Sequence, residues 1–98
     1  MKYLTSLAFV LCASASHAEL IERACLGSDR SGGNRALCGC IQDAADMTLS
    51  GQDQRLAASF FANPDRAQQI RQSDRRSDEV FWRRYRAFGE TAEAFCRS

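Results

Sequence analysis

The stretch Cys38-Gly39-Cys40 decides the fold of this chain. Beyond the first 18 residues only two other cysteines occur, Cys25 before the pair and Cys96 after it. If each cysteine of the pair bonds to one outer cysteine, both ends of the chain are tied to one point. Whether these bonds form depends on the compartment, which the first residues indicate.

The first 18 residues are typical of a cleaved export signal. Lys2 supplies the positive charge, Leu4 to Ala13 form a short apolar run, and Ser16-His17-Ala18 places small residues before a cleavage site. The run is far shorter than the ~20 apolar residues that cross a bilayer. We therefore expect cleavage near Ala18, a single domain over residues 19–98, and a periplasmic or secreted location. A lipid anchor on Cys12 is disfavoured, because large residues precede it.

Export also limits the available chemistry. Residues 19–98 hold four cysteines, twelve arginines and twelve acidic residues, but neither histidine nor lysine. Four cysteines in a short exported chain predict two disulfides, which small domains need because they bury little apolar surface. The lack of histidine excludes a Ser/His hydrolase. The acidic pairs Asp43/Asp46 and Asp78/Glu79 read most simply as solvated helix surface, so we expect neither an enzyme nor a bound cofactor.

Apolar periodicity and capping signals predict helices over residues 19–26 and 35–49, from about 51 to 62, from 64 to about 72, and from 78 to about 97. The expected N-caps are Asn34, Ser50, Asn63 and Ser77. Ser50 and Asp53 have the spacing of a capping box, and Pro64 suits a first helical position. The sequence thus predicts an all-α domain, a small bundle of four or five helices stapled by two disulfides.

In the helix over residues 35–49 the two cysteines cannot share a face. At 100° per residue Cys38 and Cys40 lie about 200° apart, on the two shoulders of an apolar arc. The arc contains Leu37, Ile41, Ala44, Ala45 and Thr48, while Gln42, Asp43 and Asp46 are expected on the opposite, polar side. Each cysteine can therefore staple a different neighbouring element to this helix.

The last helix has the clearest apolar pattern. Phe81, Tyr85, Phe88, Ala92 and Phe95 recur at 4-3-4-3 spacing, with Cys96 at the edge of this stripe and Gly89 on its shoulder, where a neighbouring backbone could approach. A bond from Cys96 to the Cys38/Cys40 pair makes this helix antiparallel to the helix over 35–49. Hairpin geometry favours Cys25–Cys38 and Cys40–Cys96. Such bridges close loops of about 14 and 57 residues, which stabilise by roughly 3 and 4 kcal/mol in the chain-entropy model.

Besides structural disulfides, the cysteines suggest two other functions, thiol–disulfide exchange and zinc binding. Cys38 and Cys40 are an alternative site for thiol–disulfide exchange, because a helix N-terminus and the adjacent Arg35 can lower a thiol pKa. A four-cysteine zinc site is disfavoured, because Cys-x-x-Cys pairs are missing and an oxidising compartment consumes thiolates. Structural disulfides are favoured, since Cys25 and Cys96 are available as permanent partners.

Charge is unevenly distributed along the chain. Residues 19–53 hold six acids and three arginines, net −3, whereas residues 66–86 hold seven arginines and three acids, net +4. One interpretation is pairing between the halves, or a solvated face. The other is a docking patch made by Arg71, Arg75, Arg76, Arg83, Arg84 and Arg86, since guanidinium groups suit carboxylate and phosphate. An acidic envelope protein, an anionic lipid or an envelope polymer would be the partner, rather than nucleic acid.

Several segments resemble one family of short exported bacterial proteins. These are Glu22-Arg23-Ala24-Cys25-Leu26, Arg35-Ala36-Leu37-Cys38-Gly39-Cys40-Ile41-Gln42, Ala45-Asp46-Met47-Thr48-Leu49, and Gln72-Ser73-Asp74-Arg75-Arg76-Ser77-Asp78-Glu79 followed by Phe81-Trp82-Arg83-Arg84-Tyr85. Some members carry the label "arginine transporter". The resemblance brings no catalytic residues. Because 80 residues without a membrane span form no path through a bilayer, it implies at most an accessory role in amino-acid uptake.

Overall fold

The computed structural model describes residues 19–28 and 34–97, and this part of the chain contains five helices and no strand. They are α1 (Leu20–Leu26), α2 (Arg35–Thr48), α3 (Gly51–Ala62), α4 (Pro64–Arg71) and α5 (Arg76–Cys96). The expected export signal, residues 1–18, lies outside the described residues, as do residues 29–33 of the loop after α1. The predicted all-α bundle is confirmed.

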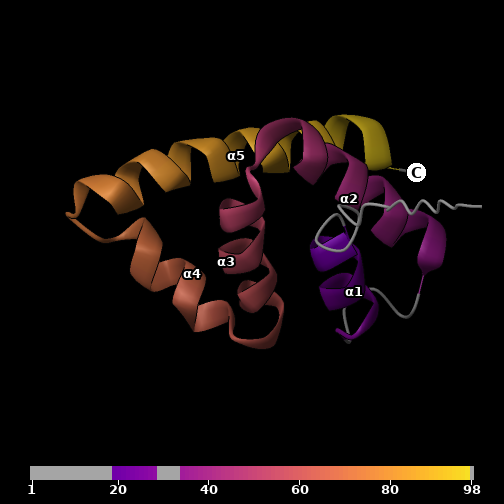
Figure 1. Ribbon diagram of the computed structural model, residues 1–98, viewed down its shortest axis with the longest axis horizontal. Coiled ribbons are helices and arrows are strands. Elements are labelled where there is room, and N and C mark those ends of the chain that lie inside the picture. Colours follow the sequence, from indigo (N-terminus) through magenta and orange to yellow (C-terminus); the bar gives the residue numbers. More distant parts are fainter. Residues whose placement is uncertain (1–18, 29–33, 98) are drawn as a thin grey trace, which may run out of the picture.

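The longest helix, α5, forms one side of the molecule (Figure 1). Helix α2 packs beside the C-terminal half of α5 and runs in the opposite direction, while α3 meets the middle of α5 and α4 meets its N-terminal end. Helix α1 packs against both α2 and α3. The antiparallel arrangement expected for α2 and α5 is thus present.

Two disulfides connect the pair in α2 to the outer cysteines, as expected. Cys25 in α1 bonds Cys38 with an S–S distance of 2.01 Å, and Cys40 bonds Cys96 at the end of α5 with 2.13 Å. Because Cys38 and Cys40 lie on different sides of α2, one bond fastens α1 and the other fastens α5. Helix α2 is therefore the element that holds the two ends of the chain together.

Side-chain capping marks where α2 and α3 begin. Asn34 Oδ1 accepts from the Leu37 N–H at 2.9 Å, and Ser50 Oγ accepts from the Asp53 N–H at 3.0 Å. The Asp53 carboxylate in turn accepts a hydrogen bond from the Ser50 N–H at 3.3 Å, which completes the predicted capping box. Pro64 is the first residue of α4, although the Asn63 side chain makes no capping bond.

The start of α5 was predicted two residues too late. The helix begins at Arg76 with Arg75 at the N-cap position, so Ser77 lies inside the first turn instead of capping it. The Arg75 carbonyl accepts the first helical hydrogen bond, from the Glu79 N–H at 3.0 Å. Ser73 acts in the connection before the helix, where its Oγ accepts from the Arg75 N–H at 3.0 Å.

The core has its largest side chains where α3, α4 and α5 meet. Phe60 of α3 contacts Phe81 and Tyr85 of α5 edge-to-face, with ring centroids 6.1 and 5.2 Å apart. Phe88 continues this cluster, since its ring lies 5.7 Å from that of Tyr85, and Ile70 of α4 joins the same core. Edge-to-face aromatic pairs are favourable beyond their buried area, so this cluster stabilises the half of the molecule that lacks disulfides.

Part of the predicted α5 stripe is not buried. Phe81 and Phe88 are buried, whereas Phe95 is 71% exposed. The bond to Cys40 fixes Cys96 against α2, and Phe95, about 100° around the helix from Cys96, stays at the rim. The expectation for Gly89 is also wrong, because within the described residues no neighbouring element comes within 4 Å of the place where its Cβ would be.

The buried face of α2 overlaps the predicted arc only in part. Ala44 and Ala45 are buried as predicted, together with Cys38, Gln42 and the C-cap residue Leu49, whereas Leu37, Ile41 and Thr48 are only partly covered. The prediction is wrong for Gln42, which is expected on the polar side of the helix but is buried. Helix α1 covers the side that carries Cys38 and Gln42, because the Cys25–Cys38 bond brings α1 there, and Gln54 of α3 contacts Gln42 on the same side.

Candidate functional site

The predicted docking arginines follow the end of α4 and the outer side of α5. Arg71 lies in the last turn of α4, Arg75 precedes α5, and Arg76, Arg83 and Arg86 lie on α5. All five are exposed, and within residues 19–28 and 34–97 none has a carboxylate oxygen within 4.0 Å. We call these five residues the arginine surface. At 100° per residue Arg76, Arg83 and Arg86 fall within one arc of about 80° on α5, so these three form an exposed ridge along the helix, and Arg75 directly precedes it.

Acidic residues are interleaved with this ridge. Glu79 lies between Arg76 and Arg83 in helical register, and Glu90 lies one turn beyond Arg86. Both are exposed, and Glu90 lines a shallow hollow of about 230 Å³ together with Arg83 and Arg86. The acids reduce the net positive charge of the ridge, so its attraction for an anionic partner depends on contact between groups rather than on a long-range field.

The sixth predicted arginine, Arg84, has a partner inside the protein. Its Nε donates to Asp53 Oδ2 at 2.7 Å and its Nη2 to Asp53 Oδ1 at 2.9 Å. The Asp53 side chain is only 9% exposed, and the hydrogen bond from Arg84 holds the pKa of this carboxyl below its usual range. For this residue the alternative interpretation, pairing between the two halves, is correct. Arg84 connects α3 to α5, and although it is partly exposed its guanidinium is already occupied by Asp53.

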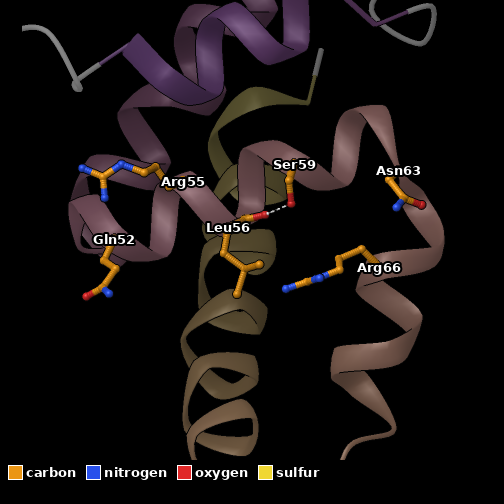
Figure 2. Close-up of a pocket in the computed structure, with 6 residues that line it drawn as sticks. All are labelled: Gln52, Arg55, Leu56, Ser59, Asn63 and Arg66. Carbon is orange, nitrogen blue, oxygen red and sulfur yellow. Dashed lines mark hydrogen bonds between the residues drawn. The ribbon is translucent and has the colours of Figure 1, made fainter.

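A groove between α3 and α4 holds two arginines that the sequence analysis left out of the site. The groove has a volume of about 540 Å³ and is lined by Gln52, Arg55, Leu56, Ser59, Asn63 and Arg66. Figure 2 shows the Arg66 side chain reaching towards Leu56, whereas Arg55 and Gln52 point away from the middle of the groove. Ser59 Oγ is occupied by donating to the Leu56 carbonyl at 2.6 Å. The two guanidinium groups do not converge on one point.

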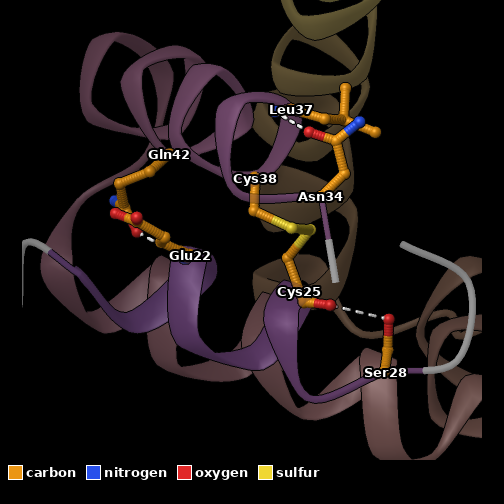
Figure 3. The surroundings of a disulfide bond; sticks show 7 residues. All are labelled: Glu22, Cys25, Ser28, Asn34, Leu37, Cys38 and Gln42. Atoms are coloured by element: carbon orange, nitrogen blue, oxygen red, sulfur yellow. Dashed lines mark hydrogen bonds between the residues drawn. A yellow bond between two sulfur atoms is a disulfide. The ribbon is translucent and has the colours of Figure 1, made fainter. Parts of the chain in front are cut away.

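The two disulfides differ in their access to solvent. Cys25 and Cys38 are 2% and 0% exposed, enclosed between α1 and α2 (Figure 3). Cys40 and Cys96 are partly exposed. Because Cys38 and Cys40 bond to different partners and not to each other, the pair does not form a Cys-Gly-Cys redox disulfide. The two disulfides, which join α1 to α2 and α2 to α5, are arranged as structural bonds. Within the described residues no group of three His, Cys, Asp or Glu side chains is placed to hold a metal ion.

A buried polar network joins α1, α2 and α3, and the sequence analysis missed it. Gln42 Oε1 accepts from the Glu22 N–H at 2.8 Å, and Gln42 Nε2 donates to Gln54 Oε1 at 2.8 Å and to Asp46 Oδ1 at 2.9 Å. Gln42 and Gln54 are both buried. Every polar atom of the Gln42 amide therefore has a partner, as buried amides require. One of the acids weighed as a catalytic pair, Asp46, is thus part of a structural network.

No protein-family model, curated protein or solved structure matches this chain. In the described part of the chain, no helix combines the length and the apolar character that crossing a membrane requires. The function must therefore be inferred from the surface of the molecule itself.

Proposed function

We propose that this protein is a non-enzymatic binding protein of the cell envelope, which docks on an anionic partner through its arginine surface. The observation that carries the proposal is the contrast between Arg84 and its neighbours. Arg84 is paired with a buried carboxylate, whereas Arg71, Arg75, Arg76, Arg83 and Arg86 are exposed without such a partner in the described part. These five guanidinium groups can each donate two parallel hydrogen bonds to phosphate or carboxylate oxygens.

The shape of the surface favours an extended partner. From Arg76 to Arg86 the ridge rises about 15 Å along α5, and Arg75 directly precedes it, with Arg71 in the last turn of α4. A row of this length can contact several anionic groups at once, as in phospholipid headgroups or a carboxylate-bearing envelope polymer. Removal of the export signal near Ala18 is part of the proposal, and the two disulfides support an oxidising compartment.

The test compares two triple variants of the chain from residue 19. Arg75, Arg76 and Arg83 are replaced by glutamine in one variant, and Arg23, Arg35 and Arg55, which lie outside both the arginine surface and the end of α5 and are also exposed, in the other. Arg84 is retained in both, because its loss would leave the buried Asp53 carboxylate without its cation. Co-sedimentation is measured with vesicles containing phosphatidylglycerol and with neutral phosphatidylcholine vesicles, and polyglutamate is offered separately.

We expect the wild type and the second variant to bind the anionic vesicles and the first variant to lose most of the binding. Binding of the wild type should weaken with salt, because exposed charges are screened over ~10 Å at 0.1 M. Binding to polyglutamate alone would identify a polymer or acidic protein instead of lipid. Equal binding of both variants at every salt concentration would rule out the arginine surface. Titration with free arginine tests the uptake-accessory role, which rests on the resemblance alone.

A further inference from the structure

The end of α5 and the adjacent side of α2 carry an apolar surface that the core does not use. Phe95 is 71% exposed and Met47 is 64% exposed, and these are the large apolar side chains most open to solvent in the described part. Two hollows, of about 250 and 220 Å³, meet at Phe95. Both are also lined by Cys40, so they lie directly over the Cys40–Cys96 disulfide.

The two hollows lie on opposite sides of Phe95. Along α2, one hollow is lined by residues before Cys40, including Ala36 and Leu37, and the other by residues after it, Asp43, Ala44 and Met47. At 1.5 Å per residue the row from residue 36 to residue 47 is roughly 16 Å long. Phe95 therefore forms a ridge between two depressions, and the neighbouring disulfide holds it in place. We call Phe95 and its two hollows the Phe95 surface.

Charge completes the pattern. Asp43 lines one hollow and Arg97 lines the other, and both residues are exposed. Within residues 19–28 and 34–97, neither has an oppositely charged group within 4.0 Å. The surface thus carries a projecting aromatic ring with a depression on each side, one acidic and the other basic.

We propose that the Phe95 surface joins two copies of this chain into a symmetric dimer. The two-fold axis lies in the plane of the interface, beside Phe95 and perpendicular to the α2 row. It places the hollow with Asp43 of one copy opposite the hollow with Arg97 of the second copy. Asp43 then faces Arg97 of the partner subunit, and the reverse pair forms on the other side of the axis. The two Phe95 rings cover each other's hollows. An isologous interface requires one patch that is complementary to itself, and the order acid, ring, base has this property.

The expected dimer is weak. A patch about 16 Å long and one helix wide is smaller than the ~800 Å² per partner of a standard stable interface. We therefore expect association that depends on protein concentration, with monomer at low and dimer at high concentration. The Phe95 surface does not include the five residues of the arginine surface, so the dimer and the proposed docking function stand or fall separately.

Sedimentation equilibrium of the oxidised chain from residue 19, over a wide range of protein concentration, tests the dimer. The wild type should shift from monomer to dimer, and Phe95→Ser should remain monomeric with an unchanged melting curve. Asp43→Arg and Arg97→Asp should each weaken association at least about tenfold, because each puts two like charges face to face on both sides of the axis. Asp74→Arg is the matched control, an exposed acid in the connection before α5, and should associate as the wild type does.

Combining the charge changes gives the decisive measurement. The double variant Asp43→Arg/Arg97→Asp restores opposite charges across the axis and should regain the dimer. An equimolar mixture of the two single variants should form a heterodimer, since one copy then carries two arginines and the other two aspartates at these positions. A wild type that stays monomeric at every concentration overturns the proposal. A dimer that survives Phe95→Ser, or a charge swap that restores nothing, overturns it equally.

Discussion

The guanidinium of Arg84 contacts both carboxylate oxygens of Asp53, across 31 residues of sequence, with distances of 2.7 and 2.9 Å. The same carboxylate also accepts from the Ser50 N–H as part of the capping box. Asp53 therefore has two roles, one at the start of α3 and one in holding α3 against the middle of α5. The Asp53 carboxylate thus belongs both to the capping box that starts α3 and to the ion pair that joins α3 to α5.

Removal of Arg84 should destabilise the fold more than removal of its neighbour. Arg84→Gln leaves the Asp53 carboxylate largely buried without its cation, and a buried group that loses its partner costs about 1–3 kcal/mol. Arg83→Gln, at an exposed position, should cost under ~0.5 kcal/mol. Urea unfolding followed by circular dichroism measures both. If the two variants unfold at the same urea concentration, the Arg84–Asp53 pair contributes nothing to stability.

The same pair predicts how stability depends on pH. The pKa of Asp53 is lowered in the folded protein, so its stabilisation is fully present above the unfolded carboxyl pKa of about 3.9 and is lost as the pH falls through the folded pKa. We expect the difference in unfolding free energy between wild type and Asp53→Asn to be largest near pH 7. It should shrink below about pH 4. A difference that stays constant from pH 7 to pH 2 would contradict the role of the charge.

Gln42 should behave as a buried core residue despite its polarity. Gln42→Leu removes the acceptor for the Glu22 N–H and the donor to Gln54, and should destabilise by about 1–3 kcal/mol. Gln69→Leu, at an exposed position on α4, is the matched control and should change stability by less than ~0.5 kcal/mol. Thermal melts of the two variants give the comparison. A Gln42→Leu protein as stable as wild type would show that the network is dispensable.

Two phenylalanines of the same stripe in α5 should respond very differently to truncation. Phe88→Ala should cost about 3–5 kcal/mol, because Phe88 is 7% exposed and packs in the aromatic cluster. Phe95→Ala should be nearly neutral in dilute solution, since most of its side chain already contacts water. Glu90→Ala, at an exposed position of the same helix, is a second control expected below ~0.5 kcal/mol. Similar losses for Phe88→Ala and Phe95→Ala would place the buried face of α5 elsewhere.

The two disulfides should open in a fixed order under mild reduction. Cys40 and Cys96 are partly exposed, whereas Cys25 and Cys38 are enclosed between α1 and α2. A reductant in solution therefore attacks the Cys40–Cys96 bond first. Timed alkylation followed by peptide mapping should find labelled Cys40 and Cys96 while Cys25–Cys38 is still intact. Recovery of a Cys38–Cys40 bond in the untreated protein would refute the connectivity and bring thiol exchange to the fore.

The all-α class, the presence of two disulfides and the starts of α2, α3 and α4 followed from the sequence alone. Ser50, Asn34 and Pro64 are local signals whose partners lie within a few residues, so a helix start can be read from the chain alone. The positions of the four cysteines around Cys38-Gly39-Cys40 left few ways to connect them, and hairpin geometry favoured the connectivity that the structure has. The six candidate arginines were visible as a charge excess in residues 66–86.

Which side of each helix faces a neighbour depends on the tertiary structure. The same packing therefore sets which polar side chains have a hydrogen-bond partner in another helix. Gln42 is buried because α1 covers that side of α2 and Gln54 of α3 contacts it there, and a helical wheel of α2 contains no information about them. Arg84 and Arg83 are adjacent and chemically identical in sequence, yet Arg84 alone meets Asp53. Phe95 fits the apolar stripe, but no element within the described residues covers it. In each case the deciding contact joins residues of different helices, and such contacts depend on how the helices pack, which local periodicity does not specify.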